Sequence, residues 1–273
     1  MYNEAAATAR KPVTIPALQA MKAHGEKIAM LTCYDASFAA QLEAAGVDVA
    51  LVGDSLGMVV QGRRSTLPVT LEEIAYHTAA VARGLEATLL IADLPYMSYR
   101  DVAHAREAAA RLIGQCGAGM LKLEGGGWVC GIIADLVARE APVCAHLGLT
   151  PQAVHRLGGY RVQGREPDAA ERLLADARAV QEAGAAMLVL EAVPAPLAAR
   201  VTATLNIPVI GIGAGAGCDG QVLVLYDMLG ITPGKRPKFS RDFLAGAGGV
   251  SAALKAYVDA VRGGRFPAAE HQY

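Results

Sequence analysis

Short apolar runs alternate with helical patterns along most of the chain. The runs predict strands at residues 27–33, 47–52, 89–93, 120–124, 142–146, 187–191, 208–211 and 222–225. Apolar residues at helical spacing lie between most of them, at residues 37–45, 71–83, 102–115, 129–139, 168–183 and 196–205. Gly46 follows the first of these helices as a C-terminal cap, and Thr70 with Glu73 forms a capping box that begins the second. Eight strands joined mostly through helices predict parallel pairing and favour a closed (β/α)8 TIM barrel over an open sheet.

Four segments fit this alternation less well. Residues 15–24 read as a short amphipathic N-terminal helix that could plug the barrel floor or contact a partner. Residues 56–70 and 147–164 have no clean period and are predicted as long loops. Residues 215–220 match GxGxxG, but a strand pattern follows where a dinucleotide site needs a helix, so we reject that site. Phosphate binding at residues 211–220 stays open, because the last two loops of such barrels often hold phosphate.

Composition predicts one domain over residues 1–273, since 53% of the residues are hydrophobic and no linker or low-complexity tract interrupts the chain. The formal net charge is −1 and basic residues do not cluster, which argues against a nucleic-acid partner. Residues 1–14 lack the apolar core of a signal peptide, and the longest uncharged run, residues 201–218, contains a proline and four glycines, so no export signal and no membrane span are expected. The five cysteines are widely spaced without a CxxC pair, which favours reduced thiols and a cytoplasmic location.

Charged residues are unusual in these strands and gather at their ends. Alternation puts Lys122 and Glu124 on one face of their strand, together with Met120. The acids and the histidine found at or just after strand ends are Asp54, Asp93, Glu124, His146 and Glu191. The C-terminal strand ends of a TIM barrel carry its catalytic groups, so these side chains predict an active site.

Asp54, Asp93 and Glu124 follow neighbouring strands, where three carboxylates would repel one another without a cation. An all-oxygen set indicates Mg²⁺, or Mn²⁺, over zinc. Lys122 adds positive charge for an anionic substrate, which suits a 2-oxo acid. Glu191 lies further round the barrel and is the candidate base, which would remove the C3 proton to give a metal-stabilised enolate.

Other interpretations of the same residues stay open. A single strand-end aspartate can cap a loop, and Lys122 can serve as a structural ion-pair partner. His146 is equally consistent with a satisfied core histidine and with a substrate ligand.

Several motifs together resemble the ketopantoate hydroxymethyltransferase family. They are VGDSLGM at 52–58, STLPVT at 65–70, ADLP at 92–95, KLEGG at 122–126, HLGLTPQ at 146–152 and GIGAG at 211–215. The resemblance runs from about residue 12 to near the C-terminus. It implies an Mg²⁺-dependent barrel enzyme of pantothenate biosynthesis, which transfers a hydroxymethyl group from 5,10-methylenetetrahydrofolate to 3-methyl-2-oxobutanoate and gives 2-dehydropantoate in an aldol-type reaction. The family assembles as large homo-oligomers, typically decamers, and we expect the same here.

The resemblance also implies roles for single residues. Metal binding would fall to Asp54, Asp93 and Glu124, and Glu191 would be the catalytic base. The residues expected to contact substrate are Ser55, Asp54, Asp93, Lys122 and His146. The sequence departs from the family pattern at Gly127, Ala145 and Tyr226, where a polar or charged residue, Gly and His are expected.

Three rival hypotheses remain at this point. The first is an Mg²⁺-dependent oxo-acid lyase or mutase of the isocitrate lyase type, although the Lys-Lys-Cys-Gly loop typical of those enzymes is absent from the sequence. In the second, Lys122 is a Schiff-base nucleophile that needs no metal. The third is a protein that binds a small molecule without catalysis.

Overall fold

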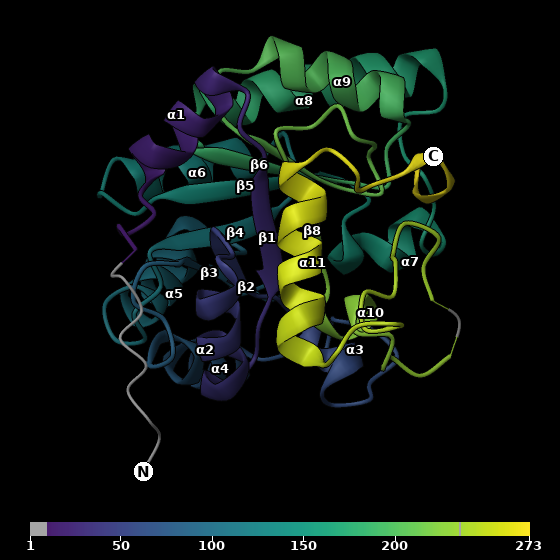
Figure 1. Ribbon diagram of the computed structural model, residues 1–273. Helices are drawn as coiled ribbons and strands as arrows, with labels where there is room; N and C mark the ends of the chain where they lie inside the picture. The colour runs from purple at the N-terminus through teal and green to yellow at the C-terminus, as the bar shows by residue number, and fades with distance from the viewer. Residues whose placement is uncertain (1–9, 235) are drawn as a thin grey trace.

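The computed structural model describes residues 10–234 and 236–273, which form a closed barrel of eight parallel strands in sequence order (Figure 1). The strands are β1 (Ile28–Thr32), β2 (Val49–Val52), β3 (Leu89–Asp93), β4 (Met120–Glu124), β5 (Val143–Gly148), β6 (Met187–Glu191), β7 (Val209–Ile212) and β8 (Gly220–Leu223). The TIM barrel prediction is therefore confirmed. Residues 1–9 lie outside the described part, so the expectation of no export signal there stays a prediction, as does a single domain over 1–273.

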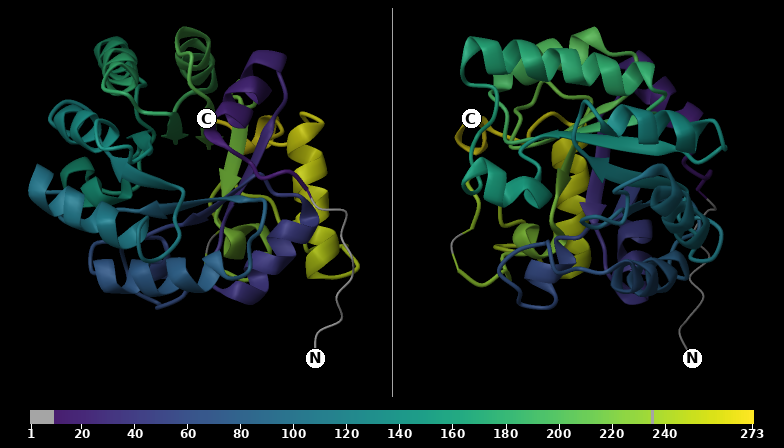
Figure 2. Two further views of the ribbon diagram at one scale, coloured as in Figure 1. Left: turned by 90° about the vertical axis from the view of Figure 1, so that its left-hand side faces the viewer. Right: turned by 180° about the vertical axis from the view of Figure 1, so that it is seen from behind.

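The longer helices surround the barrel (Figure 2). They are α1 (Ile15–His24), α2 (Ala36–Ala45), α4 (Leu71–Ala82), α5 (Val102–Leu112), α6 (Val129–Val137), α8 (Pro167–Glu182), α9 (Ala195–Thr204) and α11 (Val250–Arg262). The predicted caps are present: Gly46 adopts a left-handed conformation after α2, and Thr70 and Glu73 form both hydrogen bonds of the capping box before α4. No helix of the described residues is long and apolar enough to cross a membrane.

Alternation along each strand divides the apolar side chains into two layers. Outward-facing residues such as Leu121 and Leu123 pack with the helices in the larger cluster. Inward-facing residues such as Met120, Cys144 and Met187 form a smaller cluster inside the barrel. Since Met120 faces inward, Lys122 and Glu124 on the same face of β4 also point into the barrel, as the sequence predicts.

Helix α1 closes the barrel floor. Leu18 is 1% exposed and belongs to the inner cluster with strand residues such as Ile28 and Met30. Lys22 fixes the helix from its polar side, because its Nζ lies 2.6 Å from Asp219 Oδ2 in the loop before β8. Of the two roles that the sequence leaves open for this helix, the structure confirms the plug.

Several predictions of irregular or short segments were wrong in detail. The expected loop 56–70 begins with α3 (Leu56–Val59), and the expected loop 147–164 contains η1 (Pro151–Ala153) and α7 (Val154–Leu157). One helical turn is too short for a period to be recognised. These short helices, with α10 (Leu225–Met228), gather on the right of Figure 1, around the C-terminal strand ends.

The eighth strand lies two residues earlier than predicted, at Gly220–Leu223 instead of 222–225. Its register is set by Gly220, which is buried between Ile28 of β1 and Ile210 of β7, where an added Cβ would meet the Ile28 carbonyl oxygen at 2.4 Å. The described segment between β7 and β8 contains no helix. The helix α11, which comes after β8 in the chain, packs against β1 and α2. Tyr257 of α11 donates to the carbonyl oxygens of Met30 and Gln221, both at 2.9 Å.

Candidate active site

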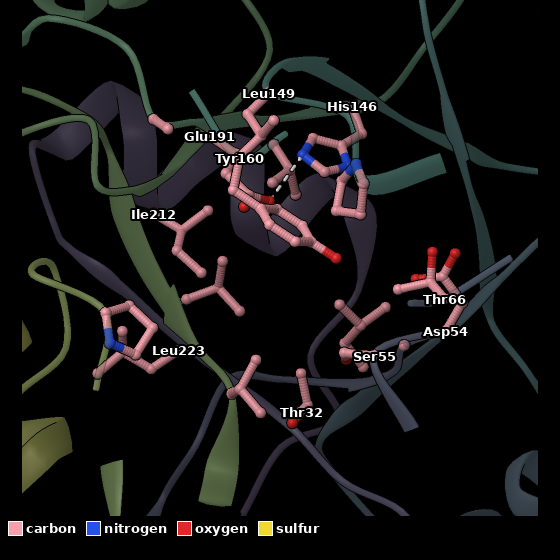
Figure 3. A pocket seen from close by; sticks show the side chains of 18 of the residues that line it. Thr32, Asp54, Ser55, Thr66, His146, Leu149, Tyr160, Glu191, Ile212 and Leu223 are labelled. Carbon is pink, nitrogen blue, oxygen red and sulfur yellow. Dashed lines mark ion pairs between the residues drawn. The ribbon is translucent and has the colours of Figure 1, made fainter. Parts of the chain in front are cut away.

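A cavity of about 490 Å³ opens at the C-terminal ends of the strands. Its polar wall carries Asp54, Asp93, Lys122, Glu124, His146 and Glu191. Its other walls are largely apolar, with contributions from Leu149, Ile212, Phe239 and Tyr273. Figure 3 shows Glu191 beside His146 on one side of this cavity and Asp54 and Ser55 on another. All predicted site residues, Ser55 included, therefore line one cavity.

Asp93 is the last residue of β3, and its carboxylate contacts residues of both neighbouring strand ends, Lys122 of β4 and Asp54 just after β2. Its Oδ1 lies 2.6 Å from Lys122 Nζ, and both side chains are 5% exposed or less. Its Oδ2 accepts a hydrogen bond of 2.9 Å from the backbone N–H of Asp54. Gly53, just before Asp54, leaves room for the Ser55 hydroxyl, since a Cβ at this position would meet Ser55 Oγ at 2.8 Å.

His146, on β5, lies between the acids of β4 and β6. Its Nδ1 is 3.4 Å from Glu124 Oε1, and its Nε2 is 3.3 Å from Glu191 Oε2, the ion pair drawn in Figure 3. Gly148 lets β5 run close to β6, because it has φ +87° and an added Cβ would meet the Glu191 carbonyl oxygen at 2.3 Å. His146 is 3% exposed, so its imidazole is a buried link between the two carboxylates.

Burial, and after it the negative charges of Asp93 and Glu124, raises the pKa of Asp54 to about 8. Burial also raises the pKa of Asp93, although the Lys122 ammonium opposes the shift. For Lys122, burial lowers the pKa, but the charges of Asp93, Glu124 and Asp54 outweigh it and the net shift is upward. Asp54 and Asp93 thus hold their protons more tightly than usual, chiefly because they are buried, while Lys122 stays an ammonium.

The neighbouring acids also favour the charged form of His146. Burial and the Lys122 ammonium lower its pKa, but the hydrogen-bonding carboxylates of Glu124 and Glu191 outweigh them and raise the pKa to about 9. The imidazolium can donate to both acids, one from each ring nitrogen. It therefore fixes the orientation of Glu191, whose side chain is 14% exposed toward the cavity.

Sequence reasoning gave no role to Gln152 and Tyr99, which contact the acids from loops. Gln152 Nε2 donates to Asp54 Oδ2 at 2.8 Å, and its backbone N–H donates to Glu124 Oε2 at 2.9 Å. Tyr99 donates to Gln152 Oε1 at 2.7 Å. The Thr-Pro-Gln sequence after β5 was the only sequence feature that pointed to Gln152. Loops have no periodicity, so the sequence could not show which of these side chains points toward the site.

Ser55 accepts or donates a hydrogen bond of 2.8 Å with the hydroxyl of Tyr34, which comes from the loop after β1. Tyr226, one of the departures from the family pattern, stacks at a tilt on Tyr34 with ring centroids 5.8 Å apart. It contacts the site only through Tyr34. Of the other departures, Ala145 lies in the outer core and Gly127 has a positive φ of 58° with open space around it.

Metal binding needs separate consideration. Within residues 10–234 and 236–273, no group of three or more His, Cys, Asp or Glu side chains is arranged to hold a metal ion by itself. Glu124 Oε1 is nevertheless buried, and its contact with His146 Nδ1 is a long one of 3.4 Å. Mg²⁺ commonly binds through one or two carboxylates and keeps several waters. The donor set therefore fits a hydrated Mg²⁺ ion, and the predicted three-ligand site stays a prediction.

The chain matches known proteins over nearly its full length. Residues 12–269 match the family model described as ketopantoate hydroxymethyltransferase. A 3-methyl-2-oxobutanoate hydroxymethyltransferase from Thiobacillus denitrificans is 62% identical over 263 residues, covering 96% of this chain and 100% of the relative. A protein of the same name from Paraburkholderia phymatum is 58% identical over 266 residues, covering 97% of this chain and 98% of the relative.

Solved structures share the fold at much lower identity. The phosphoenolpyruvate phosphomutase from Streptomyces platensis subsp. rosaceus superposes with a TM-score of 0.61 at 15% identity, covering 79% of this chain and 82% of that one. A 2,3-dimethylmalate lyase gives a TM-score of 0.56 at 15% identity, with 79% and 82% covered. These similarities show the barrel architecture and no more.

Proposed function

Since the chain belongs to the ketopantoate hydroxymethyltransferase family, we propose that it transfers a hydroxymethyl group to 3-methyl-2-oxobutanoate and forms 2-dehydropantoate. We take 5,10-methylenetetrahydrofolate as the donor: its methylene carbon, with the oxygen of water, becomes the hydroxymethyl group, and tetrahydrofolate leaves. This reaction belongs to pantothenate biosynthesis. The observation that carries the proposal is that the Glu191–His146 pair lines the same cavity as Asp54, Asp93 and Lys122.

The charge balance of the site supports a role for Mg²⁺. Asp54, Asp93 and Glu124 gather around the Lys122 ammonium, so a bound cation would offset negative charge in a buried site. Asp54, Asp93 and Glu124 would hold the ion, directly or through its waters, as the family resemblance implies. When bound, Mg²⁺ acts as a Lewis acid that stabilises negative charge on the oxo oxygen of the substrate.

Glu191 is the base in this proposal. Its carboxylate borders the cavity, and His146 Nε2, 3.3 Å from Glu191 Oε2, orients it. Glu191 takes the proton from C3 of the oxo acid, and the resulting carbon nucleophile attacks the one-carbon unit of the donor. A positioned base of this kind contributes roughly 10² to 10⁴-fold to the rate.

Lys122 and Ser55 bind the substrate. Lys122 remains protonated because its ammonium is paired with Asp93 at 2.6 Å, so it contributes a fixed positive charge beside the substrate carboxylate. Ser55 has its hydroxyl held by Tyr34 at 2.8 Å and can hydrogen-bond the same carboxylate. His146 completes the substrate contacts through the ring edge that faces the cavity.

The assay is consumption of 3-methyl-2-oxobutanoate by the purified protein in the presence of 5,10-methylenetetrahydrofolate. We expect turnover with Mg²⁺ and its loss after EDTA treatment, with recovery when Mg²⁺ is returned. No turnover with this pair of substrates would refute the proposal. Activity in EDTA together with a borohydride-trapped substrate adduct on Lys122 would favour the Schiff-base alternative, which the raised pKa of Lys122 disfavours.

Self-association is part of the same proposal. The family resemblance suggests a homo-oligomer, and we propose a decamer for this chain. Analytical ultracentrifugation of the purified protein measures its mass in solution, and a monomeric mass would contradict this part.

A further inference from the structure

Gln152 hydrogen-bonds to two of the acids in the site, Asp54 and Glu124. It lies in η1, directly after β5, and is 9% exposed. Its side-chain Nε2 donates to Asp54 Oδ2 at 2.8 Å and to the Leu94 carbonyl oxygen at 3.0 Å. Its backbone N–H donates to Glu124 Oε2 at 2.9 Å. One residue thus holds one oxygen of each of two acids that come from different strands.

Tyr99 determines which way the amide of Gln152 faces. The amide nitrogen has two hydrogens, and both have acceptors in Asp54 and Leu94. The amide oxygen then needs a donor, which the Tyr99 hydroxyl supplies at 2.7 Å. A flipped amide would turn its oxygen toward a carboxylate and a carbonyl oxygen, so the tyrosine hydroxyl selects the observed orientation.

The ring of Tyr99 is itself fixed. It is 5% exposed and stacks on Trp128 with a centroid distance of 6.0 Å and an interplanar angle of 6°. Its hydroxyl also lies 3.3 Å from the carbonyl oxygen of Glu124. Tyr99 therefore reaches the acids only through Gln152 and the backbone of β4, and it does not line the cavity.

Gln152 leaves the second oxygen of each acid for other contacts. Glu124 Oε1 is buried and faces His146 Nδ1 at 3.4 Å, a longer contact than the 2.9 Å hydrogen bond that holds Oε2. Asp54 Oδ1 accepts no hydrogen bond from the described part of the chain, whereas its Oδ2 is used by Gln152. Each acid therefore has one oxygen that Gln152 holds and a second oxygen that it leaves for other contacts. This arrangement orients a carboxylate for a cation.

We propose that Gln152 and Tyr99 are positioning residues, which fix Asp54 and Glu124 so that their other carboxylate oxygens are oriented for a divalent cation. This inference rests on the proposed function, because it takes the acids as the Mg²⁺ site. Residues that orient metal ligands typically contribute about 10 to 100-fold to metal affinity or activity. The alternative is a purely structural brace, which would stabilise the fold without affecting the cation.

The first test is Tyr99→Phe, which removes the hydroxyl and preserves the ring on Trp128. We expect Mg²⁺ affinity, measured by isothermal titration calorimetry on the full-length protein, to fall about tenfold or more. Tyr76→Phe is the matched control, since Tyr76 is 73% exposed, packs edge-on against His77 and does not line the cavity, and this variant should bind Mg²⁺ as the wild type does. Thermal unfolding of the metal-free proteins checks that the variants fold.

Gln152→Met is the second test, because it preserves length and removes the amide while the backbone N–H to Glu124 stays. We expect an affinity loss at least as large as that of Tyr99→Phe. The double variant should bind no more weakly than Gln152→Met alone, since the hydroxyl acts through the amide. If the double variant instead loses Mg²⁺ affinity by the product of the two single losses, the two residues act independently and their proposed coupling is wrong.

The outcomes separate this inference from the proposed function. If wild-type protein binds Mg²⁺ and both variants bind it equally well but unfold at lower temperature, the residues are a structural brace and the inference is wrong. If wild-type protein takes up no Mg²⁺, the metal part of the proposed function fails and this inference falls with it. Weaker binding in both variants with an unchanged control supports positioning.

Discussion

Substitution of Glu191 by Gln tests the assignment of the base most directly. The amide has the same shape and can still accept a hydrogen bond from His146 Nε2, which lies 3.3 Å from Glu191 Oε2. The cavity should therefore keep its form. The substitution removes the basic carboxylate and one of the two acids that raise the pKa of His146.

The expected loss follows from that change. A positioned general base is worth about 10² to 10⁴-fold in rate, equivalent to about 3 to 5 kcal/mol of transition-state stabilisation. We expect the C3 proton exchange of 3-methyl-2-oxobutanoate to slow by that factor, whereas its binding and Mg²⁺ binding persist. The pKa of His146 should also fall below about 9, because Glu124 alone remains to stabilise the imidazolium.

Exchange is measured by proton NMR in deuterated water, with Mg²⁺ and the oxo acid but without the one-carbon donor. This isolates proton removal from the later attack on the donor. Glu171→Gln is the control, because Glu171 is exposed and pairs with Arg200 on the barrel surface. Equal exchange rates in Glu191→Gln and wild type, with the oxo acid bound in both, would remove the base assignment.

Three further predictions test the electrostatics and the core. In metal-free protein the raised pKa of Asp54 makes the folded state hold its proton more tightly than the unfolded state, so stability to urea should fall as pH rises from the unfolded carboxyl value of about 3.9 through about 8. A rise over that range would contradict the shift. Burial raises the pKa of Cys144 to about 12, so iodoacetamide should leave this residue unmodified in the native protein. The partly exposed Cys116 should be labelled, and peptide mass spectrometry distinguishes the two. Rapid labelling of Cys144 would show that the inner layer is accessible to the reagent. Leu18→Ala should lower the free energy of unfolding by about 2 to 5 kcal/mol in urea titrations, and a loss within experimental error would mean that α1 does not seal the floor.

The barrel was predictable because its strands follow simple rules. The run Val49–Val52 is apolar at every position and buried at every position, as expected for a parallel strand covered on both faces. The charged residues on β4 stood out against the same background. Both signals are local, so the sequence contains them directly.

The missed features depend on contacts between distant segments. The exact register of β8 is set by the close approach of Gly220 to Ile28, which lies far away in the sequence. Gln152 reaches Asp54 across 98 positions of the chain, and His146 meets Glu191 across the β5 and β6 strand ends. The sequence could predict which residues reach the barrel mouth but not which of their atoms meet.

Because α1 closes the barrel floor, molecules have to reach the site from the opposite end. Leu18 and the inner apolar layer lie beneath the acids, and the cavity opens at the C-terminal strand ends. In the reaction we propose, both substrates would therefore enter, and both products leave, at the end of the barrel where the strand ends carry the acids. Closure of the floor thus confines exchange to the face that holds the proposed catalytic groups.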